Sequence, residues 1–181
     1  MLVKEKAKAK KSFKGITHFF NKNTVCEQGH NANRTGRDLE NRVESLLVSK
    51  GAFPVMYRDW VTDKVVVPNH VKKVLYKQVD YTKLWGTRGK SDFALEMPTK
   101  KNIRIDTRYQ GVAGSVDEKV CYLLETAEKC YPEDHVIIVI DGPGIRPAIR
   151  EWMTLKASSV KHKKIEIRNL AQFELWASKN A

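Results

Sequence analysis

The chain has 181 residues, a length that suits one domain with a tail. Hydrophobic residues make up 41% and charged residues 30%, a balance that excludes a wholly disordered chain. The longest apolar run, Val136 to Ile140, is too short to span a membrane, and we expect no membrane partner and no secretory signal. The three cysteines fit no disulfide framework, so we expect a reducing, intracellular environment.

The net charge of +12 is concentrated at the N-terminus. Residues 1–37 hold nine lysines and arginines against two acids. We therefore predict a basic, weakly ordered arm over 1–37, with Lys10 and Lys11 among its phosphate contacts, followed by a single domain over 38–181.

The charge of the predicted domain is also uneven. Residues 61–104 carry ten bases and four acids, whereas residues 105–141 carry three bases and eight acids. The basic regions indicate a polyanion as the partner, with Arg88 and Lys90 as candidate nucleic-acid-binding residues. The acidic stretch would repel that polyanion unless a cation were bound there.

Apolar periodicity and turn residues predict alternating helices and strands, which is typical of an α/β fold with a mixed central β-sheet flanked by helices. In chain order we expect a helix from Thr35 or Asp38 to about Lys50, strands at Phe53–Tyr57, Val65–Val67, Val74–Val79, Ser91–Met97 and Ile103–Gln110, a helix from Ser115 to about Tyr131, a strand at His135–Ile140, a helix over about 145–157, a strand at Ile165–Ile167, and a helix capped by Asn169 and ending near Ser178.

Two aspartates carry the chemistry of the predicted hairpin between Ser91–Met97 and Ile103–Gln110. Asp92 begins a strand that is otherwise apolar, and Asp106 lies inside the next strand. If the chain turns at Lys100 to Asn102, the two carboxylates face one another. Such a pair repels unless it is protonated or bridged by a cation, and Mg²⁺ prefers carboxylate oxygens.

Strand alternation adds two more polar residues to Asp106. Because side chains repeat every two residues along a strand, Asp106, Arg108 and Gln110 share one face. Arg108 can neutralise a phosphate charge, and Gln110 can orient a water molecule. The alternative interpretation is that these three polar residues simply form the solvent-exposed face of the strand.

GKSDFAL (89–95) followed by IRIDTRYQ (103–110) resembles the PD-(D/E)xK nuclease superfamily. That pattern has an acid on one strand, then acid-x-Lys on the next, with a helix before and a helix after. Asp92 matches the first acid, with Ser91 where a proline usually stands, and Asp106 matches the second. The resemblance implies Mg²⁺-dependent hydrolysis of DNA phosphodiester bonds by metal-activated water, with Mn²⁺ as a substitute. The members that the sequence resembles are phage and restriction-type endonucleases, which implies a cytoplasmic protein of a bacterial or phage-infected cell.

The sequence departs from this pattern at Arg108, which stands where the motif has lysine. Arginine keeps its proton, so it can stabilise charge but cannot act as a base. Some members supply a displaced lysine from the following helix, for which Lys119 is the candidate. Three alternatives stay open: Arg108 takes the electrostatic part, Lys119 takes it, or the protein does not cleave.

The helix that precedes the motif often donates a glutamate to the metal in this superfamily. Glu40 lies closer to the apolar face of that helix than Glu44 does, at 100° per residue. The metal set implied by the resemblance is therefore Asp92, Asp106 and Glu40, with the carbonyl of Thr107 as an extra ligand.

The rival to a DNA endonuclease is a non-catalytic nucleic-acid-binding protein that keeps the fold, or a nuclease acting on RNA or on branched junctions. The short chain also leaves a homodimer open. Trp60 and Trp85 border the basic region 61–104 and either contact bases or pack in the core or against a hairpin.

Overall fold

The computed structural model describes residues 22–99, 101–112 and 116–181. Lys10, Lys11 and the expected helix cap at Ser115 lie outside these residues. The chain divides into two units, Met1–Arg34 and Thr35–Ala181. In the first unit, residues 22–34 are helical.

Most predicted elements are present within a few residues of their expected limits. The helices and strands are α2 (Lys22–Ser49), β1 (Phe53–Met56), α3 (Tyr57–Val61), β2 (Val74–Thr82), β3 (Arg88–Glu96), β4 (Asn102–Tyr109), α4 (Val116–Lys129), β5 (His135–Asp141), α5 (Pro147–Ser159), β6 (Lys164–Arg168) and α6 (Leu170–Asn180).

Two expectations about the elements are wrong. Helix α2 begins at Lys22 rather than at Thr35 or Asp38. No proline interrupts the added residues, and extending a formed helix avoids the cost of a new nucleus. The strand expected at Val65–Val67 is a loop, in which Asp63 has a φ of 54° and Val66 is exposed.

Within the described residues, six strands form one mixed sheet in the order β1-β2-β3-β4-β5-β6. β2, β3 and β4 are antiparallel neighbours, whereas β1 pairs with β2, β4 with β5 and β5 with β6 in parallel. The predicted hairpin is confirmed, since Glu96 pairs with Asn102. The expected fold class, a mixed central sheet flanked by helices, is confirmed as well.

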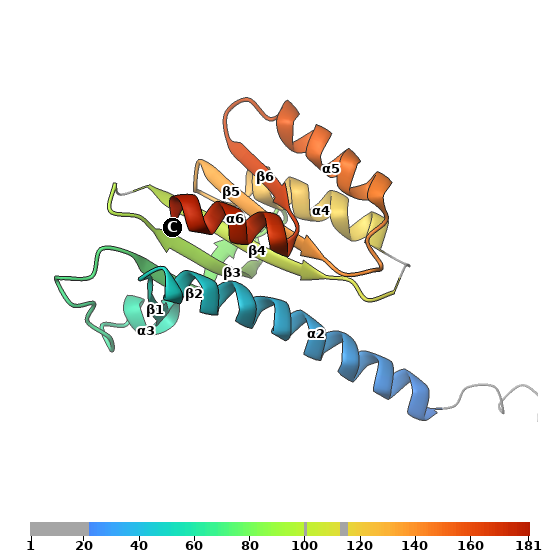
Figure 1. The fold of residues 1–181 in the computed structure, drawn as a ribbon, viewed down its shortest axis with the longest axis horizontal. Helices are drawn as coiled ribbons and strands as arrows, with labels where there is room; N and C mark the ends of the chain where they lie inside the picture. Colours follow the sequence, from blue (N-terminus) through green and yellow to red (C-terminus); the bar gives the residue numbers. More distant parts are fainter. Residues whose placement is uncertain (1–21, 100, 113–115) are drawn as a thin grey trace, which may run out of the picture. The chain divides into compact units, whose positions relative to one another are not determined.

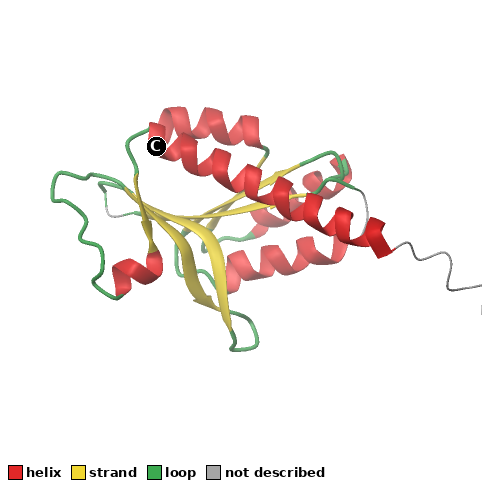
Figure 2. Ribbon diagram, turned by 90° about the horizontal axis from the view of Figure 1, so that it is seen from below, coloured by secondary structure: helices red, strands yellow, loops and turns green. Residues whose placement is uncertain are grey.

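Helices cover both faces of this sheet (Figures 1 and 2). Leu39, Val43 and Leu47 of α2 share one buried cluster with Phe173 and Trp176 of α6 on one face. On the other face, α4 and α5 pack against β5 in a second buried cluster, made of Val120, Leu123, Leu124, Ala127, Tyr131, Val136, Ile138, Ile140, Ile145, Met153, Ala157 and Ile165. The strand pattern predicted for β4 follows from these layers, because Ile103 and Ile105 belong to the first cluster and Asp106 points to the opposite side.

The strand ladders are interrupted at Asp92. β2 and β3 pair on either side of Gln78 and Asp92, but these two residues do not pair with each other. Gln78 has a φ of 54°, which breaks the regular strand geometry at this point. On the other side, β3 and β4 pair only as far as Phe93 and Ile105. The backbone of Thr107 is therefore left open to a side chain.

A turn after β5 holds the end of β4. The backbone N–H of Gln110 donates to the carbonyl of Asp141 at 2.9 Å, and the N–H of Gly144 donates to the carbonyl of Gln110 at 2.9 Å. Gly142 has a φ of 109°, and a Cβ there would lie 2.2 Å from the carbonyl oxygen of Gln110. Only glycine allows the backbone at position 142 to lie this close to Gln110, and this contact holds the end of the polar face of β4.

Candidate active site

Asp92 lies at the point where β3 and β4 separate, and its carboxylate takes the place of the missing ladder bond. Its Oδ2 accepts hydrogen bonds from the backbone N–H and from the hydroxyl of Thr107, both at 2.7 Å. Burial and the neighbouring charge of Asp106 raise the pKa of Asp92 to about 7, against the opposing effects of Arg108 and Thr107.

Asp106 is fully buried in the next strand. Its Oδ2 accepts a hydrogen bond from the hydroxyl of Tyr131 at 2.8 Å and one from Arg108 at 3.2 Å. Its Oδ1 is buried and has no hydrogen-bond partner within the described part of the chain. An unpartnered carboxylate oxygen in the protein interior is costly, so this oxygen is open to a ligand.

Arg108 joins the two aspartates. One terminal nitrogen lies 3.8 Å from Oδ2 of Asp92 and donates to the carbonyl of Thr107 at 2.7 Å, while the other lies 3.2 Å from Asp106. The charges of Asp106 and Asp92 raise the pKa of Arg108, so it stays cationic. Half of its side chain remains exposed, which leaves the guanidinium accessible from solvent.

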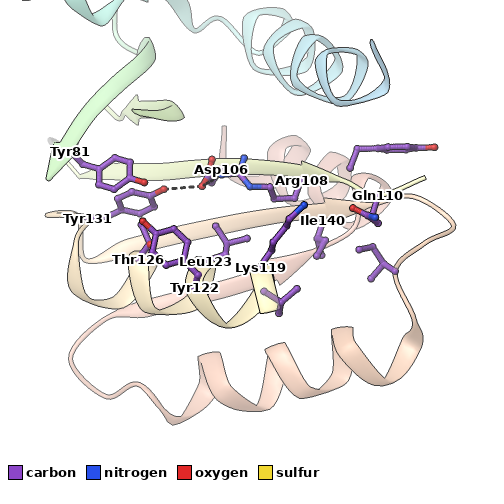
Figure 3. A pocket seen from close by; sticks show the side chains of 13 residues that line it. Tyr81, Asp106, Arg108, Gln110, Lys119, Tyr122, Leu123, Thr126, Tyr131 and Ile140 are labelled. Carbon is purple, nitrogen blue, oxygen red and sulfur yellow. Dashed lines mark hydrogen bonds and ion pairs between the residues drawn. The ribbon is translucent and has the colours of Figure 1, made fainter. Parts of the chain in front are cut away.

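A cavity of ≈ 230 Å³ opens beside these groups, between β4 and α4 (Figure 3). Asp106, Arg108 and Gln110 line it from the strand, and Lys119 lines it from the helix. Figure 3 shows Lys119 reaching from α4 toward the Arg108 side of the cavity. The two residues considered for the role of the motif lysine thus line the same cavity, Arg108 from the strand and Lys119 from the helix. The amide of Gln110 donates to the carbonyl of Val112 at 2.7 Å.

Glu40 lies on α2, and its hydrogen-bond partner is Gln78 rather than either aspartate. Its Oε1 accepts a hydrogen bond from Gln78 at 3.2 Å, and Gln78 is the residue across the interrupted ladder from Asp92. In the described residues, no three His, Cys, Asp or Glu side chains form a group that could hold a metal ion. The assignment of Glu40 as a third metal ligand stays a prediction.

The two basic residues chosen for phosphate contact on β3 differ in their surroundings. Arg88 makes a two-pronged ion pair with Asp80, at 3.0 and 2.5 Å, which lowers the pKa of Asp80. Lys90 is exposed and pairs with Asp80 across the β2–β3 ladder. Arg88 would therefore give up part of an ion pair on contact with a phosphate.

Trp85 and Trp60 also differ. Trp85, in the turn between β2 and β3, is 63% exposed and stacks on Tyr122 of α4 with ring centres 5.2 Å apart. Trp60 packs against Tyr76, with ring centres 4.9 Å apart. Of the two alternatives considered for these residues, Trp60 packs on the sheet and Trp85 remains largely open to solvent.

Sequence reasoning missed the groups that support Asp106. Tyr131 follows α4 and is 25 residues from its partner, and burial and Asp106 raise its pKa, so its hydroxyl stays a donor. The buried side chain of Arg104 lies over the Tyr131 ring, 5.0 Å from its centre. Arg104 also makes a two-pronged ion pair with Glu133 at 2.9 and 2.7 Å. Strand alternation placed Arg104 on the same face as Asp106, which was the available signal.

The groups around Asp106 fit a divalent cation. Asp106 Oδ1 is buried and has no partner in the described part of the chain. Asp92 is a second carboxylate, and the Arg108 nitrogen nearest to it also contacts the carbonyl of Thr107. These are hard oxygen donors of the kind that Mg²⁺ takes, commonly through one or two carboxylates and several waters.

A mixed sheet between helices, with two aspartates and a cationic side chain where β3 and β4 separate, defines an α/β domain of the nuclease type. The model of a PD-(D/E)XK nuclease superfamily domain matches residues 31–181, and the chain belongs to this superfamily. Membership suggests a nuclease with nucleic acid as its substrate. No curated protein matches the chain. Among the described residues, no helix has the length and apolar character needed to cross a bilayer.

Proposed function

We propose that this protein is a Mg²⁺-dependent DNA endonuclease that hydrolyses phosphodiester bonds. The observation that carries the proposal is the buried oxygen of Asp106, beside Asp92 and Arg108, that has no hydrogen-bond partner among the described residues. Burial and the charge of Asp106 raise the pKa of Asp92, and a bound cation relieves the repulsion between the two carboxylates.

Asp92, Asp106 and the carbonyl of Thr107 would hold the cation, with Glu40 as the third carboxylate and Mn²⁺ as a substitute. A bound divalent ion supplies an activated water and neutralises charge on the phosphate. The hydrogen bonds from Thr107 to Asp92 and from Tyr131 to Asp106 fix the two carboxylates for this purpose.

The cationic side chains bind and neutralise the phosphodiester. Arg108 keeps its proton, so it stabilises negative charge rather than moving a proton. Lys119 lines the same cavity and adds a second positive charge, while Gln110 orients water or the DNA backbone. Arg88 and Lys90 of β3, together with Lys10 and Lys11 of the N-terminal arm, contact neighbouring phosphates.

One observation favours a second candidate, a DNA-binding protein without cleavage activity. The guanidinium of Arg108 already lies against both aspartates and the carbonyl of Thr107. An internal cation of this kind compensates part of the negative charge without a metal ion.

A nicking assay on supercoiled DNA separates the two candidates. We expect cleavage with Mg²⁺ and none with EDTA, and the loss of cleavage in Asp92→Ala and Asp106→Ala. Glu125→Ala is the control, since this exposed carboxylate pairs only with Lys129 in the described structure. Duplex, single-stranded, flap, junction and RNA substrates are compared in parallel.

Calorimetry supplies a readout that does not depend on cleavage. Wild type and Glu125→Ala are expected to bind Mg²⁺ or Mn²⁺, and the two aspartate variants to bind little. Full cleavage by a purified, folded Asp106→Ala protein would refute the assignment of the active site.

A further inference from the structure

The cavity between β4 and α4 extends well beyond the groups needed to handle a phosphate. Its far end is walled by Tyr81, Tyr131 and Tyr122, with Leu123 and Ile140 among its apolar residues (Figure 3). At ≈ 230 Å³ it is smaller than the roughly 300 Å³ at which pockets for drug-sized ligands begin. A ligand of one or two fused rings suits this space.

A polar atom inside the cavity lacks a partner. Thr126 is 1% exposed, lines the cavity from α4, and its hydroxyl has no hydrogen-bond partner among the described residues. A buried hydroxyl without a partner is unfavourable. A ligand that fills the cavity and offers a polar edge to Thr126 would supply the missing bond.

An aromatic series leads from the surface to this space. The exposed ring of Trp85 stacks on Tyr122, and Tyr81 meets Tyr131 edge to face with ring centres 4.9 Å apart. Base stacking on aromatic side chains is a common way to hold unpaired nucleotides, and extruded bases are read by apolar walls and a few hydrogen bonds.

We infer that this cavity binds one unpaired nucleobase of the DNA strand, beside the phosphodiester bound by Arg108. The inference rests on the proposed function, because it names the substrate of that same site. Tyr81, Tyr122 and Tyr131 flank the base, Thr126 bonds to its edge, and Trp85 stacks on the neighbouring base. The substrate is therefore DNA with an unpaired nucleotide, since a fully paired duplex must first break a base pair to fill the cavity.

The test measures binding in EDTA, where no cleavage occurs. Three labelled duplexes are compared by fluorescence anisotropy: fully paired, with one unpaired adenine, and with an abasic site in place of that adenine. Wild type is expected to bind the unpaired adenine about tenfold or more tightly than the abasic site, the contribution of one stacked base. Equal affinity for these two duplexes overturns the inference.

Two variants locate the effect in the cavity. Leu123→Trp fills the space and should abolish the preference, while Glu125→Gln, on the exposed side of the same helix, should keep it. Thr126→Val keeps the volume and removes the unpartnered hydroxyl, so it should fold and lower the preference about two- to tenfold. A folded Leu123→Trp protein that keeps the wild-type preference for the unpaired adenine overturns the inference. If that variant does not fold, an unchanged preference in Thr126→Val overturns it instead.

The outcomes separate this inference from the proposed function. Mg²⁺-dependent cleavage without any preference for the unpaired base would leave the nuclease assignment standing and remove the base site. A clear preference without cleavage would keep the base site and assign the protein to the DNA-binding alternative.

Discussion

The carboxylate of Asp92 replaces a strand-to-strand hydrogen bond by accepting both the backbone N–H and the hydroxyl of Thr107, each at 2.7 Å. The β3–β4 ladder stops one pair earlier, at Phe93 and Ile105. The side chain of Asp92 is thereby fixed to the backbone of the strand that carries Asp106, so the relative position of the two acids depends on this contact.

Removing the Thr107 hydroxyl tests that dependence. Thr107→Val keeps the shape of a nearly buried side chain but takes away one of the two donors to Asp92. We expect a loss of about 1 to 2 kcal/mol in the free energy of unfolding, measured with urea, and weaker Mg²⁺ binding by calorimetry. Thr107→Ser retains the hydroxyl and should behave like wild type. A Thr107→Val protein with unchanged stability and metal affinity would show that the backbone N–H alone holds Asp92.

The pKa of Asp92 predicts how stability depends on pH without metal. Its pKa in the folded protein, about 7, is above the ordinary aspartate value of 3.8, so the folded state binds a proton more tightly than the unfolded state. The contribution of Asp92 to the free energy of unfolding is therefore fully present at pH values below about 4 and declines as the pH rises toward 7. Asp92→Asn removes this decline while keeping an oxygen that can accept from Thr107.

At pH 8 in EDTA, Asp92→Asn should be more stable than wild type by on the order of 2 kcal/mol, with a smaller difference at pH 5. Adding Mg²⁺ should raise the melting temperature of wild type and leave that of the variant unchanged. Identical pH dependence of unfolding in the two proteins would contradict the raised pKa.

Arg108 and Lys119 compete for the role of the motif lysine. Because Arg108 contacts both aspartates while Lys119 lines only the cavity wall, Arg108→Ala should lower the cleavage rate by about 100-fold and Lys119→Ala by less. Arg108→Lys, which restores the usual motif, should retain more activity than Arg108→Ala. Lys129→Ala, on the exposed side of α4, is the control. The reverse order of the two alanine variants would assign the role to Lys119, and wild-type rates in both would remove both assignments.

The N-terminal arm is expected to contribute phosphate contacts that weaken with salt. Deleting residues 1–14, which include Lys10 and Lys11, should weaken DNA binding at low salt and reduce the slope of affinity against salt concentration. Circular dichroism should show that the remaining chain stays folded. Equal affinities of the full and shortened chains at every salt concentration would assign no binding role to these residues.

Local patterns in the sequence determined the alternation of β4 and the cap of α6. The two-residue period separates Ile103 and Ile105 from Asp106 on any strand, whatever lies around it. Asn169 caps α6 as expected, with its side chain accepting from the backbone N–H of Gln172 at 2.8 Å. Both features depend on neighbours a few residues away, so periodicity and capping chemistry are sufficient to predict them.

Only the tertiary structure decided which groups support the aspartates and which basic residues are already engaged. Tyr131 reaches Asp106 because α4 packs across β4, and Arg88 is held by Asp80 because β2 and β3 pair in one register. These contacts join residues that are far apart in the chain or depend on the exact alignment of two strands, and a change of register by one residue would reverse every side chain of a strand. The sequence by itself determined the residue types of the site and the faces on which they lie. Long-range packing, which no local pattern encodes, decided their partners and the cavity beside them. It also decided that one oxygen of Asp106 has no partner among the described residues.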